Sequence, residues 1–140
     1  MKSLDILLVE DNEGDIILTT EAFEESKIIN ILKVIRDGRE VVNFFENLTD
    51  KDEIPDLVLL DINLPKMSGH EVLTYIKNHE KYKQIPVIML TTSSAEKDIL
   101  QSYKSHVNCY ITKPIDVNEF VQAVTKIEDF WINIVSIPKN

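Results

Sequence analysis

The fifteen residues 58–72, VLLDINLPKMSGHEV, decide the fold of this chain. Their apolar start, preceded by Leu57, ends in the carboxylate Asp61, and a loop containing Pro65 and Gly69 follows. A short apolar run bounded by turn residues is typical of a buried strand. Because an ionised carboxylate beside a buried strand is costly unless other groups pair with it, we expect partners of Asp61 elsewhere in the chain.

Short apolar runs alternate with helical patterns along the whole chain. The runs cover residues 5–9, 31–35, 57–60, 87–90 and 109–111, and the helical patterns cover about 15–26, 39–48, 69–79, 95–105 and 117–129. Four of the runs are nearly continuous, as in parallel strands covered on both faces, whereas 31–35 contains Lys33 and suits an edge. Ser68 and Glu71 have the spacing of a capping box at the start of the third helix. We predict an α/β fold, with a doubly wound five-stranded parallel sheet and right-handed crossovers.

The composition fits one domain. The chain has 140 residues, 44% of them apolar, so we expect a single domain over 1–140, with its core at about 4–129 and an aromatic tail at 130–140. A formal charge of −9, from 15 basic and 24 acidic residues, disfavours nucleic acid and anionic membranes as partners. Cys109 is the only cysteine, and neither a signal peptide nor a membrane span is recognisable, so we expect a cytoplasmic protein.

Polar and charged residues follow four of the predicted strands. Glu10 and Asp11 come after the first strand, Asp61 after the third, Thr91 after the fourth, and Lys113 closely after the fifth. In parallel α/β sheets, ligands bind outside the carboxyl ends of the strands. We therefore expect three carboxylates, a hydroxyl and an ammonium group to converge at one edge of the sheet.

This group of acids predicts a metal site. Carboxylates about 4 Å apart repel by roughly 4 kcal/mol per pair at an effective dielectric constant near 20, and one lysine cannot neutralise three of them. A divalent cation is implied, and oxygen ligands without a nearby histidine or thiolate favour Mg²⁺ or Mn²⁺ over zinc. We expect a phosphoryl group at the remaining coordination position, with Thr91 and Lys113 holding its other oxygens.

The nucleophile of such a site is expected to be a carboxylate. No serine or cysteine with a positioned base is recognisable, and the G-x-S-x-G, Walker and G-x-G-x-x-G motifs are absent from the sequence. Asp61 is the best candidate to form an acyl phosphate. Its place at a strand end is then tolerable because the metal and Lys113 neutralise it.

Four segments carry a resemblance to a known family. LLVEDNEGD, VLLDINLPKMSGHEVL, PVIMLTTSS and YITKPID, in this order and spacing, resemble the CheY-like receiver domain of two-component response regulators over about residues 4–129. The resemblance implies a flavodoxin-like (βα)5 fold with strand order 2-1-3-4-5. It also implies that Asp61 accepts a phosphoryl group from a sensor histidine kinase. Glu10, Asp11, Asp61 and the backbone carbonyl of Asn63 are then the ligands of Mg²⁺ or Mn²⁺.

The same resemblance implies roles for the other residues of the site. Thr91 and Lys113 bind the phosphoryl group, Thr91 and Tyr110 form a coupled switch, and the peptide bond between Lys113 and Pro114 is cis. The segments VEDNEGDI, DGREVVNFF and FWINIV further resemble stand-alone receivers paired with phytochrome-type kinases. That resemblance implies a homodimer through the fourth helix, fifth strand, fifth helix and tail. A histidine phosphotransfer protein is a further candidate partner.

Two residues are predicted to set the lifetime of the phosphorylated state. Asn63 and Ser93 lie two residues beyond Asp61 and Thr91, so we expect them to flank the path of the water that hydrolyses the acyl phosphate. Asn63 could orient this water through its side-chain amide.

Signalling through a changed protein contact is the main functional hypothesis, because no effector domain is recognisable. Phosphatases resembling the haloacid dehalogenase group also use a strand-end aspartate and Mg²⁺, but they need an acid at the position of Asn63. We therefore expect self-catalysed phosphotransfer and dephosphorylation rather than a multiple-turnover enzyme. A phosphate-independent interaction module is the third hypothesis, and the intact set of acids argues against it.

Overall fold

The structure, a computed structural model, describes residues 4–25, 30–92, 109–116, 118–120 and 122. Several predictions concern residues outside these ranges: the helix expected over 95–105, most of the helix expected over 117–129, Ser93, and the tail at 130–140. The homodimer surface depends on these segments. In the described part of the chain, no helix is both long enough and apolar enough to span a bilayer.

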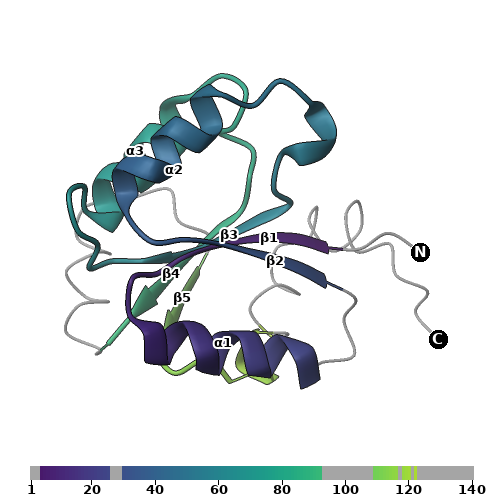
Figure 1. Cartoon of the computed structure of the whole chain (residues 1–140), viewed down its shortest axis with the longest axis vertical. Helices are drawn as coiled ribbons and strands as arrows, with labels where there is room; N and C mark the ends of the chain where they lie inside the picture. Colours follow the sequence, from purple (N-terminus) through teal and green to yellow (C-terminus); the bar gives the residue numbers. More distant parts are fainter. Residues whose placement is uncertain (1–3, 26–29, 93–108, 117, 121, 123–140) are drawn as a thin grey trace.

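Five parallel strands form one sheet, as predicted (Figure 1). They are β1 (Leu4–Val9), β2 (Asn30–Ile35), β3 (Leu57–Asp61), β4 (Val87–Thr91) and β5 (Cys109–Thr112). Their order is β2-β1-β3-β4-β5, so β3 lies at the centre and β2 at an edge. The prediction that 31–35 forms an edge strand is confirmed, and the side chain of Ile31 there is 59% exposed.

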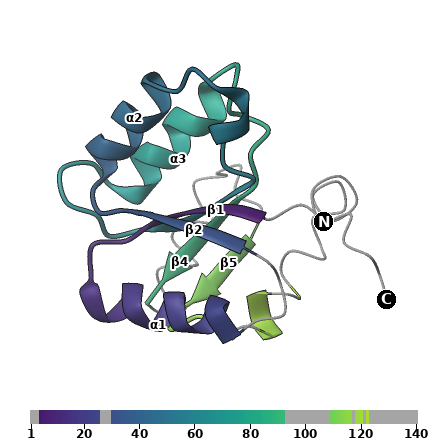
Figure 2. The same ribbon diagram turned by 45° about the vertical axis from the view of Figure 1, so that its right-hand side comes forward.

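Helices cover both faces of the sheet. Figures 1 and 2 show α1 (Glu13–Glu25) on one side and α2 (Gly38–Glu46) and α3 (Gly69–Asn78) together on the other. A short 3₁₀ turn, Lys51–Glu53, precedes β3. Residues 118–120 are also helical, and the ring of Phe120 meets that of Phe23 from α1 edge-on, with 4.7 Å between ring centroids.

Side-chain caps determine where the helices begin. The predicted capping box is confirmed, because Ser68 accepts a hydrogen bond from the Glu71 N–H and Glu71 accepts one from the Ser68 N–H. Helix α1 begins two residues before the predicted start at Asp15. The reason is Asn12, whose side-chain oxygen accepts a hydrogen bond from the Asp15 N–H at 2.9 Å and so allows the first turn to form earlier.

Two apolar clusters form the core, one on each face of the sheet. Leu59 of β3 belongs to the cluster beneath α1, whereas its neighbours Val58 and Leu60 pack against α2 and α3. All of these side chains are fully buried. Burial on both faces explains why the strand sequences are continuously apolar rather than alternating.

Candidate functional site

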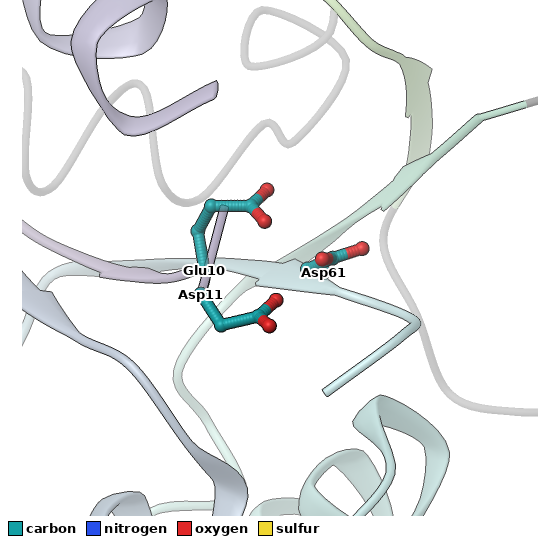
Figure 3. A group of neighbouring side chains, drawn as sticks. All are labelled: Glu10, Asp11 and Asp61. Carbon is teal, nitrogen blue, oxygen red and sulfur yellow. The ribbon is translucent and has the colours of Figure 1, made fainter. Parts of the chain in front are cut away.

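Three acidic side chains meet where β1 and β3 end. Figure 3 shows Glu10 and Asp11, which follow β1, beside Asp61, the last residue of β3. One carboxylate oxygen from each residue lies within 4.8 Å of the other two. Glu10 and Asp61 are 1% and 2% exposed, whereas Asp11 is open to solvent. Three oxygen donors at this separation suit a hard divalent cation.

Lys113 brings a positive charge into this group of acids. Its Nζ lies 3.0 Å from Oε1 of Glu10, 2.9 Å from Oδ2 of Asp15 and 3.4 Å from Oδ2 of Asp61. The Lys113 backbone N–H donates to the carbonyl of Thr91 at 2.7 Å, and the Lys113–Pro114 peptide bond is cis. Contacts of main chain and side chain thus hold the ammonium group at the carboxyl edge of the sheet.

The electrostatics of the site favour added positive charge. Burial is the main cause that raises the pKa of Asp61 from 3.8 to about 7, and the hydrogen bond and charge of Glu10 act in the same direction. Lys113 and the Asn63 N–H, which donates to Asp61 Oδ1 at 3.2 Å, oppose this rise. Burial lowers the pKa of Lys113, but its carboxylate partners outweigh burial and the net shift is upward. A bound cation would therefore stabilise the ionised form of Asp61.

The hydroxyl of Thr91 lies buried at the same edge of the sheet. Thr91 ends β4, directly after Leu90, which pairs with Asp61 across the sheet. Its Oγ1 is buried and has no hydrogen-bond partner among the described residues. A buried hydroxyl without a partner costs about 1 to 3 kcal/mol, so an oxygen-rich ligand at this edge would remove that cost.

The loop that carries Asn63 is held from two sides. On one side, the Gly69 N–H donates to the carbonyl of Ile62 at 3.0 Å. On the other, the start of α2 approaches so closely that a Cβ on Gly38 would lie 2.3 Å from the carbonyl oxygen of Met67. Backbone contacts of this kind fix the position of the Asn63 carbonyl more firmly than a free loop would.

The sequence-predicted residues are brought together to different degrees. Glu10, Asp11, Asp61 and Lys113 lie in one cluster. Tyr110 is partly buried and packs against the cluster beneath α2 and α3. The predicted roles of Thr91 and Tyr110 as a switch, and of Asn63 as a metal ligand, stay predictions.

Sequence reasoning missed Asp15. This residue contacts Lys113 more closely than Asp61 does. The available signal was an acid in the first turn of the helix that follows the acidic pair, but such acids also occur there because they favour the helix dipole. Only the fold reveals that Asp15 faces the site.

Known proteins resemble this chain over nearly its full length. The family model described as "Response regulator receiver domain" matches residues 6–125. Response regulator Rcp1 of Synechocystis sp. (strain ATCC 27184 / PCC 6803 / Kazusa) is 42% identical over 135 residues, which are 95% of this chain and 92% of Rcp1. The Mn²⁺-bound form of Rcp1 superposes with a TM-score of 0.70 and 42% identity, covering 96% of this chain and 99% of that one.

Two further solved structures are similar. The bacteriophytochrome response regulator AtBRR has a TM-score of 0.84 and 38% identity, covering 94% of this chain and 96% of its own. The phosphorylated cyanobacterial phytochrome response regulator RcpA has a TM-score of 0.72 and 43% identity, covering 95% and 96%. A family match across most of the sequence, the sheet order and the shared fold lead to one conclusion: the chain belongs to the response regulator receiver domain family.

Proposed function

We propose that this receiver domain accepts a phosphoryl group on Asp61 from a sensor histidine kinase and signals through a changed protein contact surface. Receiver domains are the partners of such kinases in two-component systems. The observation that carries the proposal is the convergence of Glu10, Asp11 and Asp61, with the Lys113 ammonium 3.4 Å from Asp61. This arrangement suits a carboxylate nucleophile, a cation and an anionic group in one place.

The proposed reaction is an in-line displacement at phosphorus. A carboxylate oxygen of Asp61 forms a bond to phosphorus while the bond to the donor nitrogen of the kinase histidine breaks. Glu10, Asp11, Asp61 and the Asn63 carbonyl would hold Mg²⁺ or Mn²⁺, which supplies positive charge for the phosphoryl oxygens. The chain's own contribution is to place the nucleophile and to offer Lys113 and the Thr91 hydroxyl to those oxygens; this hydroxyl has no partner in the described part of the chain.

The switch is proposed to run through Thr91. A hydroxyl without a partner among the described residues gains one when a phosphoryl group arrives, so the phosphorylated state favours a shift of Thr91 toward Asp61. Tyr110, on the neighbouring strand β5, would follow this shift and alter the surface near it.

The first test is intact mass after incubation with acetyl phosphate, with and without Mg²⁺. We expect one phosphoryl increment on the native chain in Mg²⁺, and none on Asp61→Asn, because the amide cannot form the acyl phosphate. Glu21→Gln, an exposed substitution on α1, serves as the control and should be phosphorylated like the native chain. An increment that persists in Asp61→Asn would contradict the assignment of Asp61.

The same assay separates the alternatives. Steady release of phosphate from simple phosphomonoesters, lost in Asp61→Asn, would indicate a phosphatase. No increment from acetyl phosphate and none from any histidine kinase tested would favour a phosphate-independent interaction module.

Asn63 and Ser93 are proposed to tune the lifetime of the phosphorylated state. The Asn63 backbone N–H donates to Asp61 Oδ1 at 3.2 Å, and this contact supports a role for Asn63 at the proposed phosphorylation site. We expect Asn63→Val with Ser93→Val to change the rate of acyl phosphate hydrolysis several-fold, since neither valine can orient water. The measurement is the decay of the phosphorylated mass after the donor is removed. An unchanged rate in the double variant would refute this role.

The finer assignment of partners is also a proposal. A phytochrome-type kinase is supported by two of the similar structures, the bacteriophytochrome response regulator AtBRR at 38% identity and the cyanobacterial phytochrome response regulator RcpA at 43%. Phosphotransfer from purified kinases of this and other classes would test it. We also propose phosphotransfer to a histidine phosphotransfer protein. A homodimer is a further proposal, and sedimentation of the full chain and of a chain that ends before Phe130 tests it.

A further inference from the structure

Lys113 is held mainly by carboxylates that are not the proposed phosphorylation site. Its Nζ lies 2.9 Å from Asp15 and 3.0 Å from Glu10, both within hydrogen-bond distance, but 3.4 Å from Asp61. The Lys113 side chain is 11% exposed and that of Asp15 is 29% exposed, so the pair is only partly screened by water. Asp15 is therefore a strong partner of this ammonium group.

Asp15 is separate from the group of acids that suits a metal. That group comprises Glu10, Asp11 and Asp61, whose oxygens lie within 4.8 Å of one another. Asp15 comes from the first turn of α1, where its backbone N–H is fixed by the Asn12 side chain at 2.9 Å. This cap sets the position of Asp15 independently of Lys113.

A phosphoryl group on Asp61 would compete with Asp15 for Lys113. The ammonium has three N–H donors, and Asp15 and Glu10 already take two of them. One N–H remains for a phosphoryl oxygen, so any further contact requires the ammonium to turn away from Asp15 or Glu10 or to share a donor. The stronger the hold of Asp15, the weaker the contact between Lys113 and the phosphoryl group.

We propose that Asp15 is a positioning residue that restrains Lys113 beside α1 and thereby weakens the binding of a phosphoryl group at Asp61. This inference rests on the proposed function of Asp61. It assigns to Asp15 control over how stable the phosphorylated state is, without contact between Asp15 and the reacting atoms.

The test measures the affinity for beryllofluoride, a phosphoryl mimic that binds to a carboxylate oxygen, at saturating Mg²⁺ by calorimetry. Asp15→Asn keeps the shape but removes the charge, and we expect it to bind beryllofluoride about fivefold more tightly. Asp15→Glu keeps the charge and should remain close to the native affinity. Glu21→Gln, also on α1 and exposed, removes the same charge elsewhere and should change the affinity less than about twofold.

A double-mutant cycle shows whether Asp15 acts through Lys113. In a Lys113→Gln background, Asp15→Asn should no longer tighten binding. An equal gain in both backgrounds would mean that Asp15 acts by direct charge repulsion and would overturn the proposal, as would an unchanged affinity of Asp15→Asn in the native background.

A second measurement needs no phosphoryl mimic. Asp15→Asn should increase the rate at which acetic anhydride modifies Lys113, measured by peptide mass, because the amine loses a charged partner. An unchanged rate would also contradict the proposal. A native chain that bound no beryllofluoride and accepted no phosphoryl group would contradict the proposed function. A native chain that bound beryllofluoride with the same affinity as the Asp15→Asn variant would refute this inference alone.

Discussion

Replacing Asp61 by Asn is expected to stabilise the metal-free protein by about 2 to 4 kcal/mol at pH 8. Asp61 is 2% exposed, and burial with the neighbouring Glu10 raises its pKa from 3.8 to about 7. Ionising it in the folded state therefore costs about 1.4 kcal/mol for each unit of this rise. An amide removes that cost while it keeps the size of the side chain. Urea unfolding of the native protein and of the Asp61→Asn variant in a chelating buffer measures the difference in their free energies of unfolding.

The sign of the pH dependence follows from the same shift. The folded state holds the Asp61 proton more tightly than the unfolded state does. The stabilisation from this bound proton is therefore full below about pH 4 and is lost as the pH rises through about 7. The Asp61→Asn variant should not lose stability over this pH range, because its amide does not ionise. Saturating Mg²⁺ at pH 8 should stabilise the native chain much more than the variant. A native chain as stable as Asp61→Asn at pH 8 without metal would contradict the expected cost.

Gly69→Ala is expected to destabilise the protein by about 3 kcal/mol and to weaken Mg²⁺ binding. A Cβ at this position would lie 2.2 Å from the backbone oxygen of Asp61 and 2.8 Å from the Cα of Ile62. Backbone atoms cannot move aside as a flexible side chain can, so the loop must shift and carry the Asn63 carbonyl with it. Urea unfolding and a Mg²⁺ titration measure the two effects.

Gly14→Ala is the matched control. A Cβ there would meet only the side-chain oxygen of Asn12, at 3.2 Å, and alanine favours a helix over glycine. We expect a change in stability within about 1 kcal/mol and an unchanged affinity for Mg²⁺. If Gly69→Ala and Gly14→Ala changed the stability and the Mg²⁺ affinity equally, the close backbone approach at Gly69 would not determine the position of the loop.

Local rules of sequence predicted much of the fold. The continuously apolar strands identified a sheet buried on both faces, and the spacing of Ser68 and Glu71 identified the start of α3. The start of α1 was predicted two residues late because the cap by Asn12 was not recognised. These features depend on neighbours a few residues apart, which is why a single sequence reveals them.

The acids of the site were also predictable in part. Glu10, Asp11 and Asp61 follow buried strands, and the parallel topology places the ends of such strands at one edge. The sequence by itself thus determined which elements form and which polar residues stand at their ends.

Only the tertiary structure decided how those residues pair and how costly their charges are. Asp15 and Lys113 are 98 positions apart, and no local pattern shows that the first turn of α1 faces the end of β5. The raised pKa of Asp61 likewise depends on burial and on the distance to Glu10. Coulomb energies and desolvation depend on separations of a few ångströms between distant segments, and these separations exist only once the sheet and its helices have packed.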